Sequence, residues 1–150
     1  MALKTPEEFI QSIADLDLEI YLFGEKVDDY VNHPVIRPSL NCMAMTYELA
    51  QYPEYEDLML ATSHLTGRKV NRFTNIHQST GDLIKKVKML RLLGQKTGGC
   101  FQRCVSMDAL NALWSVTYDT DQATGTEYHQ RFKKYVLFLQ ENDLVADGAM

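Results

Sequence analysis

The second half of the chain carries three long stretches of helical periodicity separated only by glycine-containing breaks. Ser79 with Asp82 three residues later is a capping-box pattern, and the apolar residues that follow recur every three or four positions to about Lys96. The sequence "TGG" at 97–99 interrupts this pattern, and Gly125 interrupts it again before a last apolar stripe. The second half of the chain is therefore expected to be helical. We therefore predict a mainly α fold, a helical bundle.

The middle stretch, from Cys100 to about Tyr118, is apolar around nearly its whole circumference. This pattern predicts a central helix with neighbours on several sides. Its apolar residues include Phe101, Val105, Met107, Leu110, Leu113, Trp114 and Val116.

The first half of the chain combines helices with short β segments. Thr5, Pro6 and Glu8 form a capping pattern that predicts a helix to about Leu16. The segment "EIYLFGEKV", centred on Gly24, predicts a short two-stranded turn. A helical stripe then begins at Leu40, and its helix must end before Pro53. The segment 55–73 is consistent with a second small hairpin that turns at Thr66 and Gly67. One or two short β-hairpins therefore accompany the helices.

Length and charge exclude several classes of protein. At 150 residues the chain has the size of one domain with a real core, and its net charge of −5 argues against a nucleic-acid surface. No apolar run approaches the roughly 20 residues that span a bilayer, so we expect no membrane partner. Three cysteines behind a polar N-terminus predict a reducing, cytoplasmic environment with free or metal-bound thiols.

Two of the cysteines, Cys100 and Cys104, lie four positions apart. On a helix this spacing places Cβ atoms about 5–6 Å apart on one face, which suits two thiolates that reach one iron–sulfur cluster or one mononuclear metal. The alternative is a pair of buried cysteines that act as small apolar residues. Gly98 and Gly99 would place Cys100 on an exposed first turn, where the helix dipole favours a thiolate, and the nearby Lys96 and Arg103 add positive charge.

Two ligands do not complete a metal site, since zinc and iron–sulfur clusters usually take four. Cys42 and the four histidines, His33, His64, His77 and His129, show no metal-ligand spacing to the pair. We expect Cys42 in the core, His64 and His129 on the surface, and His77 in a packing or substrate contact.

Three segments carry a resemblance to a known family: "YLFGEKVDDYVNHPVIRPSLNCMAMTYELAQ", "NRFTNIHQSTGDLIKKVKMLRLLGQKTGGCFQRC" and "FLQENDLVADGAM". Together they resemble the N-terminal part of the 4-hydroxybutyryl-CoA dehydratases, also called vinylacetyl-CoA Δ-isomerases. These enzymes form a branch of the wider 4-hydroxyphenylacetate 3-hydroxylase family. The hydroxylases share the "YxxGExV" and "HP" elements, so "CFQRC" is the specific part of the resemblance.

The resemblance implies an acyl-CoA dehydrogenase-like subunit. Residues 1–142 would form its N-terminal α-helical domain, and residues 143–150 would begin a middle β-domain whose remainder is absent from this chain. The complete enzyme would hold FAD and a [4Fe–4S] cluster between its domains. Cys100 and Cys104 match two cluster ligands, while a His and a Cys beyond residue 150 would supply the others.

Further roles also follow from the resemblance. Arg91 and Gln102 match substrate-binding positions, although both could equally be surface residues of helices, and Met150 falls where the flavin-contacting strand begins. No catalytic residue is expected in this part of the subunit. The implied enzyme, a homotetrameric lyase and isomerase of 4-aminobutyrate metabolism, dehydrates 4-hydroxybutyryl-CoA by a radical mechanism. We expect this chain alone to be inactive and to bind neither FAD nor the cluster.

Two alternatives remain at this point. The same scaffold could serve a flavin-dependent aromatic hydroxylase, in which case the cysteine pair would be incidental. The chain could also be a non-enzymatic helical module that binds a metal such as zinc.

Overall fold

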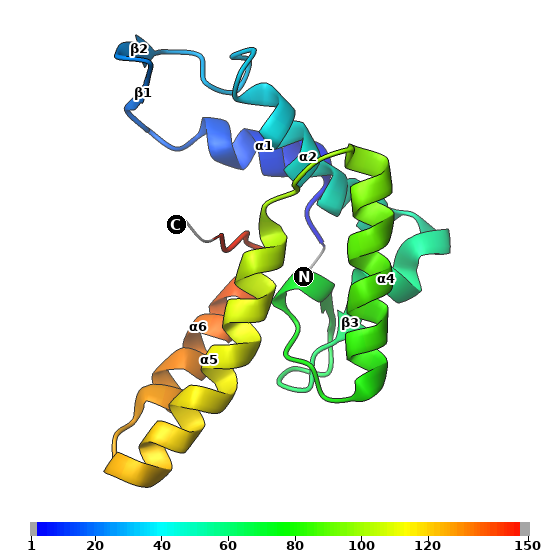
Figure 1. Ribbon diagram of the computed structural model, residues 1–150, viewed down its shortest axis with the longest axis vertical. Helices are drawn as coiled ribbons and strands as arrows, with labels where there is room; N and C mark the ends of the chain where they lie inside the picture. Colours follow the sequence, from blue (N-terminus) through cyan, green and yellow to red (C-terminus); the bar gives the residue numbers. More distant parts are fainter. Residues whose placement is uncertain (1–2, 148–150) are drawn as a thin grey trace.

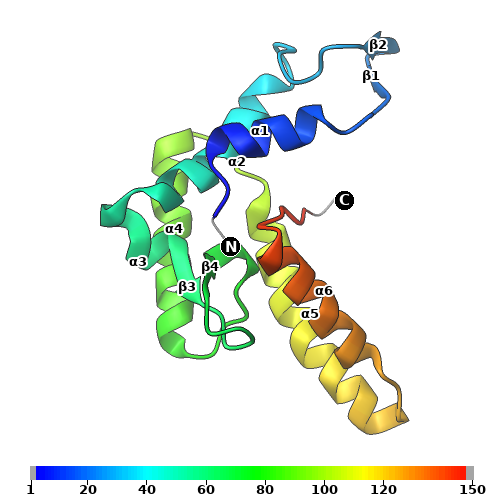
Figure 2. The same ribbon diagram turned by 180° about the vertical axis from the view of Figure 1, so that it is seen from behind.

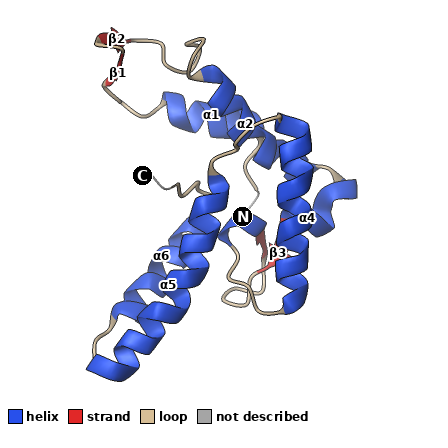
Figure 3. Cartoon of the chain, viewed as in Figure 1, coloured by secondary structure: helices blue, strands red, loops and turns tan. Residues whose placement is uncertain are grey.

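The computed structural model describes residues 3–147 and is mainly α-helical. Six α-helices and two short antiparallel hairpins follow one another along the described chain (Figure 1, Figure 3). The elements are α1 (Pro6–Ala14), β1 (Ile20–Leu22), β2 (Glu25–Val27), α2 (Arg37–Glu48), η1 (Leu49–Gln51), η2 (Pro53–Tyr55), α3 (Glu56–Met59), β3 (Leu60–Thr62), β4 (Lys69–Asn71), η3 (Arg72–Thr74), α4 (Thr80–Thr97), α5 (Arg103–Thr124) and α6 (Tyr128–Glu141).

The helix caps and hairpin turns lie where the sequence predicts them. The Thr5 side chain accepts a hydrogen bond from the Glu8 amide, and the Glu8 carboxylate accepts one from the Thr5 amide, so the capping box of α1 is complete. Ser79 caps α4 by accepting from the Asp82 amide. Gly24 and Gly67 both have positive φ, +88° and +69°, in the turns of the two hairpins. Both hairpins are therefore confirmed.

The α5–α6 pair meets the rest of the elements at the start of α5 and at the end of α6, where Gln140 forms hydrogen bonds with Ser63 and Thr74. In Figure 2, α1 and α2 pack together at one end, α4 stands beside α3 and the β3–β4 hairpin, and α5 and α6 form an antiparallel pair that extends away. No helix between residues 3 and 147 is both long and apolar enough to cross a membrane.

Two apolar clusters make up the core. The larger lies among α2, α3, α4 and the start of α5, and the smaller lies between α5 and α6. The larger consists of Leu49, Ala50, Met59, Phe73, Met89, Leu93, Phe101 and Met107, and the smaller consists of Ile76, Leu110, Val136 and Leu139. Cys42 packs partly buried against the larger cluster, as predicted.

The structure corrects the prediction for the stretch that begins at Cys100. The helix starts at Arg103, because Gln102 has a left-handed backbone (φ +65°) that no α-helix accommodates, and it continues to Thr124. It is also not surrounded, since Leu113 and Val116 are exposed and α6 is the helix that packs along it.

Two further observations concern α4 and the end of the described chain. The apolar stripe of α4 that contains Leu83 and Val87 faces outward, whereas Met89 and Leu93 are fully buried. Residues 144–147 form no strand. Residues 148–150, and with them Met150, lie outside the described residues.

Candidate metal centre

The loop between α4 and α5 carries the cysteine pair. Gly98 ends α4 in the left-handed conformation (φ +63°), with its amide hydrogen-bonded to the Gly94 carbonyl. Phe101 is buried and its ring lies 5.8 Å from that of Phe73, which fixes the loop on the core. The loop is therefore built by a glycine turn on one side and an aromatic anchor on the other.

Cys100 lies in this loop, outside the helix on which it was predicted. The left-handed turn at Gln102 brings the chain back, so that the Gln102 amide donates a hydrogen bond of 3.4 Å to the Cys100 sulfur. The Cys100 thiol also interacts with that of Cys104 on the first turn of α5. The two sulfurs are thus neighbours, as predicted, but a turn of the backbone brings them together in place of the predicted helix.

The two thiols differ in their surroundings. Cys100 is exposed, whereas Cys104 is partly buried against the larger cluster, and neither forms a disulfide. Burial, followed by the neighbouring Cys100, raises the pKa of the Cys104 thiol. The helix start that favours a thiolate was expected at Cys100, which instead lies in the loop before α5. A metal cation bound to the sulfurs would favour the thiolate form of Cys104.

Arg103, which was expected to add positive charge near the cysteines, is buried in the core. Its side chain is 1% exposed and points into the core, where it contacts Tyr47 and Phe73. Sequence reasoning missed this burial. No local signal indicates it, because the hydrogen-bond partners of Arg103, Thr46 and Leu144, lie far away along the chain.

The pair fits an iron–sulfur cluster as half of a ligand set. The chemistry of the donors is right, since two adjacent thiols can bind as thiolates and an amide hydrogen bond already reaches one sulfur. The part of the chain that the structure describes holds no group of three or more His, Cys, Asp or Glu residues able to bind a metal. Any further ligands would have to come from outside residues 3–147.

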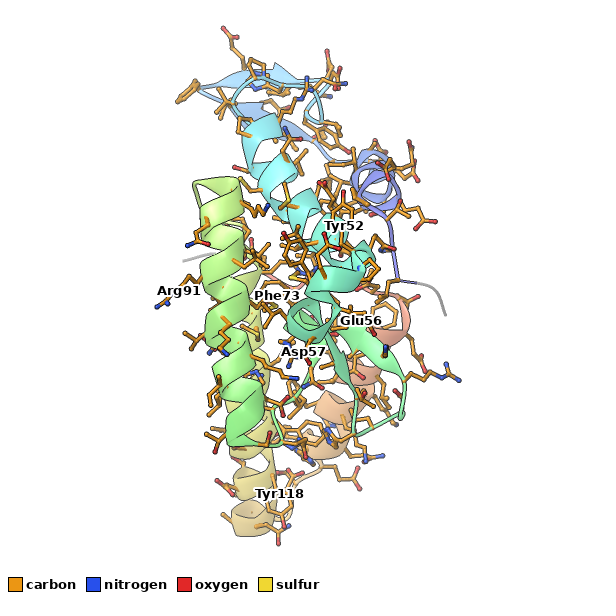
Figure 4. All side chains as sticks on the ribbon, turned by 90° about the vertical axis from the view of Figure 1, so that its right-hand side faces the viewer. Tyr52, Glu56, Asp57, Phe73, Arg91 and Tyr118 are labelled. Carbon is orange, nitrogen blue, oxygen red and sulfur yellow. The ribbon has the colours of Figure 1, made fainter. Side chains whose placement is uncertain are left out.

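The structure does not bring the two predicted substrate residues into one pocket. Arg91 is exposed on α4 and points outward (Figure 4), where it borders a shallow apolar depression with Leu83, Ile84 and Val87. Gln102 is partly buried in the cysteine loop.

The histidines lie away from the cysteine loop. His129 packs between the rings of Trp114 and Tyr118, at 4.6 and 5.6 Å, so its expected exposure is wrong. His64 is exposed, as predicted. The His77 amide donates to the Asn111 side chain, and the ring is partly buried, which supports a packing role.

A separate polar hollow lies between α3, the β3–β4 hairpin and α4. Glu56 and Asp57 lie on its rim (Figure 4), where they form ion pairs with Lys69 and Lys85. Beneath them Arg72 is 2% exposed, and its guanidinium donates to the carbonyl of Asp57 at 2.9 Å and forms an ion pair with Asp82 at 3.3 Å. These charges satisfy one another, which is typical of a structural network.

Comparison with known proteins identifies relatives along the whole chain. Residues 5–150 match the family model for the 4-hydroxyphenylacetate 3-hydroxylase N terminal region. The chain is 60% identical over 148 residues to 4-hydroxybutyryl-CoA dehydratase/vinylacetyl-CoA-Δ-isomerase of Clostridium aminobutyricum, covering 99% of this chain and 30% of that protein. It is 26% identical over 147 residues to the oxygenase component of 4-hydroxyphenylacetate 3-monooxygenase of Thermus thermophilus, covering 98% of this chain and 30% of the relative.

Solved structures match in fold. An oxygen-tolerant archaeal 4-hydroxybutyryl-CoA dehydratase from N. maritimus superimposes with a TM-score of 0.91 and 49% identity, covering 96% of this chain and 28% of that one. The oxygenase component (HpaB) of 4-hydroxyphenylacetate 3-monooxygenase complexed with FAD superimposes with a TM-score of 0.71 and 22% identity, over 95% and 29% of the two chains. These matches confirm the predicted mainly α, acyl-CoA dehydrogenase-like N-terminal fold. The chain spans less than a third of the length of these relatives.

Proposed function

Since this chain belongs to the 4-hydroxyphenylacetate 3-hydroxylase family, we propose that it is the N-terminal domain of an iron–sulfur flavoenzyme. The whole enzyme would dehydrate 4-hydroxybutyryl-CoA to crotonyl-CoA and isomerise vinylacetyl-CoA to crotonyl-CoA. The observation that carries the proposal is the "CFQRC" loop, with its two neighbouring thiols, in a chain that is 60% identical to such a dehydratase. Residues 1–142 would form the helical domain, and residues 143–150 would lead into a middle β-domain.

The reaction explains why such an enzyme needs two cofactors. Dehydration removes the C4 hydroxyl and a hydrogen from C3, yet the thioester carbonyl acidifies C2 and leaves C3 unactivated. When bound, FAD would supply one-electron transfer for a radical mechanism, and the [4Fe–4S] cluster would supply a Lewis-acidic iron for the hydroxyl. The balance is simple, because 4-hydroxybutyryl-CoA yields crotonyl-CoA and one water.

The residues of this chain would bind and orient. Cys100 and Cys104 would each hold the cluster through a thiolate, and the Gln102 amide would stabilise the Cys100 thiolate through its hydrogen bond. Arg91 and the Gln102 side chain would contact the acyl-CoA substrate, and Met150 would contact the flavin. The chain contributes no catalytic residue in this scheme, and we expect it to be inactive alone.

The remaining properties follow the same proposal. The full-length enzyme would be a cytoplasmic homotetramer of 4-aminobutyrate metabolism. The outward-facing apolar side chains of α4 and α5, including Leu83, Val87, Leu113 and Val116, would pack against other domains of its own polypeptide. A flavin-dependent aromatic hydroxylase remains the alternative, and it is supported by the lower identity, 26%, to the Thermus relative.

Two experiments test the proposal. The full-length protein, purified without oxygen, should contain iron and FAD and should convert 4-hydroxybutyryl-CoA to crotonyl-CoA, whereas hydroxylation of 4-hydroxyphenylacetate without any dehydration would support the alternative. The 150-residue chain, reconstituted anaerobically with iron and sulfide, should not form a stable cluster. One four-iron cluster per monomer on this chain alone would contradict the division of ligands proposed here.

A further inference from the structure

We propose that Arg103 is a positioning residue that locks the cysteine loop to the chain segment after α6 and so holds Cys104 where it can bind iron. The inference rests on the proposed function, because it assigns Arg103 a role toward the cluster ligands. It adds a residue that touches no cofactor and that sequence reasoning did not single out for this role.

Arg103 occupies an unusual place for a cation. It is the first residue of α5 and is 1% exposed, so it faces the unfavourable end of the helix dipole without solvent around it. Among the ion pairs of the described residues none includes Arg103, and its Nε has no hydrogen-bond partner. Burying an apolar residue here would cost less desolvation free energy than burying a charged guanidinium. The buried carboxylate of Asp143 offsets part of this cost through its charge, although the two groups form no direct ion pair, so Arg103 is also tied electrostatically to the segment after α6.

Its contacts join three distant segments. The guanidinium lies between the rings of Tyr47 and Phe73, 4.7 and 4.9 Å from their centroids. Its Nη1 donates to Thr46 Oγ1 at 2.9 Å, and its Nη2 donates to the Leu144 carbonyl at 3.4 Å. One side chain thus connects α2, the η3 turn and the segment that follows α6.

The segment after α6 is held from a second side. The Tyr47 hydroxyl donates to the Asp143 carbonyl at 2.9 Å, and the Asp143 carboxylate accepts from the Lys4 amide at 3.0 Å. Asp143 itself has a left-handed backbone, with φ +43°. Tyr47 and Arg103 therefore donate hydrogen bonds to two adjacent carbonyls, those of Asp143 and Leu144, directly after the last helix.

Arg103 transmits this anchoring to the cysteines through the backbone. Its amide donates to the Phe101 carbonyl at 2.8 Å, directly after the left-handed turn at Gln102, and Cys104 follows in the same helical turn. Metal–ligand distances must be kept within about 0.2 Å, so a small displacement of this turn changes how the Cys104 sulfur meets an iron. By this arrangement the position of residues 143–144 also determines the position of a cluster ligand.

Arg72 provides a matched control. It is buried to 2% exposure, and its guanidinium also donates to backbone carbonyls, including that of Asp57 at 2.9 Å, but it anchors α3 and not the cysteine loop. The experiment compares Arg103→Lys and Arg72→Lys in the full-length protein, purified anaerobically. It measures iron and FAD per monomer, the electron paramagnetic resonance spectrum of the reduced cluster, and iron retention in a chelator.

Both variants should lose stability, but only Arg103→Lys should alter the spectrum and weaken iron retention, by roughly tenfold, as is typical for residues that orient metal ligands. FAD content should stay unchanged. If Arg103→Lys fails to fold, Thr46→Val removes the Nη1 acceptor, together with the local hydrogen bond from the Thr46 hydroxyl to the Met43 carbonyl, and should shift the spectrum in the same direction with a smaller loss of iron.

The outcomes separate the two proposals. A wild-type protein without iron would overturn the proposed function and this inference with it. A wild-type protein with iron, but with a spectrum and iron retention unchanged in Arg103→Lys or, where that variant fails to fold, in Thr46→Val, would overturn the inference alone. Equal iron loss in Arg72→Lys would also overturn it, because general destabilisation would then explain the effect.

Discussion

The two ends of α5 lie in opposite environments. At the start of the helix Arg103 and Met107 are fully buried among α2, α4 and the η3 turn, whereas Val116 and Tyr118 near its far end are more than half exposed. The start is the more apolar of the two in sequence, and Thr, Asp and Gln residues are frequent over 115–124, yet apolar side chains remain exposed there. The first turns belong to the core of this chain, and the far end lies on a helical pair that extends away from it (Figure 1).

Apolar residues on one helix can therefore have two different roles, depending on whether they are buried or exposed. At the start of α5, burial holds a functional loop in place, since the same turn carries Cys104. At its far end Leu113 and Val116 are exposed, and under the function proposed here they would pack against other domains of the same polypeptide. One helical pattern therefore serves two purposes, and point substitutions can tell them apart.

The largest effect should come from a pair of truncations on α5. Met107→Ala should destabilise the 150-residue chain by about 3 kcal/mol, because it opens a cavity in the larger cluster. Val116→Ala, on the exposed end, should change stability by no more than about 0.5 kcal/mol. Urea unfolding of both variants measures the contrast. Equal losses at the two positions would show that the far end of α5 is as well packed as its start.

A smaller effect should come from Tyr47, beside Arg103. Tyr47→Phe removes the hydrogen bond to the Asp143 carbonyl and should cost about 1 kcal/mol, whereas the exposed Tyr135→Phe should cost almost nothing. Both are measured by urea unfolding at neutral pH. A Tyr47→Phe variant as stable as Tyr135→Phe would contradict the buried anchoring described here.

The same tyrosine predicts a pH dependence. Burial raises the pKa of Tyr47 from 10.0 to about 12. The unfolded chain therefore releases this proton first, so its contribution is intact below pH 10 and is lost as the pH rises toward 12. The fall in stability over this range should be shallower in Tyr47→Phe than in Tyr135→Phe. Parallel curves would show that Tyr47 titrates normally.

The smallest effect should come from the ion pair between Lys86 on α4 and Asp108 on α5. Because Asp108 is largely exposed, Lys86→Gln should cost less than about 1 kcal/mol, and the cost should shrink in 1 M salt. Lys88→Gln is the control, since the described residues contain no ion pair to Lys88. A cost that persists in high salt would mean that Lys86 acts through packing.

Local features were predictable from the sequence, and features that depend on distant partners were not. The capping box at Thr5 and Glu8 and the hairpin turn at Gly67 involve neighbours a few residues apart, so their residue types determine them. The start of α5 was missed because nothing in its local sequence requires Gln102 to adopt a left-handed backbone.

The burial of Arg103 was missed for a related reason. Its hydrogen-bond partners Thr46 and Leu144 lie 57 and 41 residues away along the chain. The two cysteines were predicted to be neighbours from helical spacing, but a left-handed turn at Gln102 brings them together here, so the geometry behind the prediction was different. Their role, by contrast, depends on ligands outside the described residues.

Replacing one thiol in the full-length protein tests the central claim most directly. Cys104→Ala, purified anaerobically beside the control Cys42→Ala, should cost only about 1–2 kcal/mol of stability but lose its iron and its conversion of 4-hydroxybutyryl-CoA, while FAD stays bound. Cys42→Ala should keep iron, FAD and turnover, since Cys42 only packs against the core. Iron, FAD and turnover are measured on the same preparations. Full iron and normal turnover in Cys104→Ala would contradict the account and return the two cysteines to the role of small apolar residues.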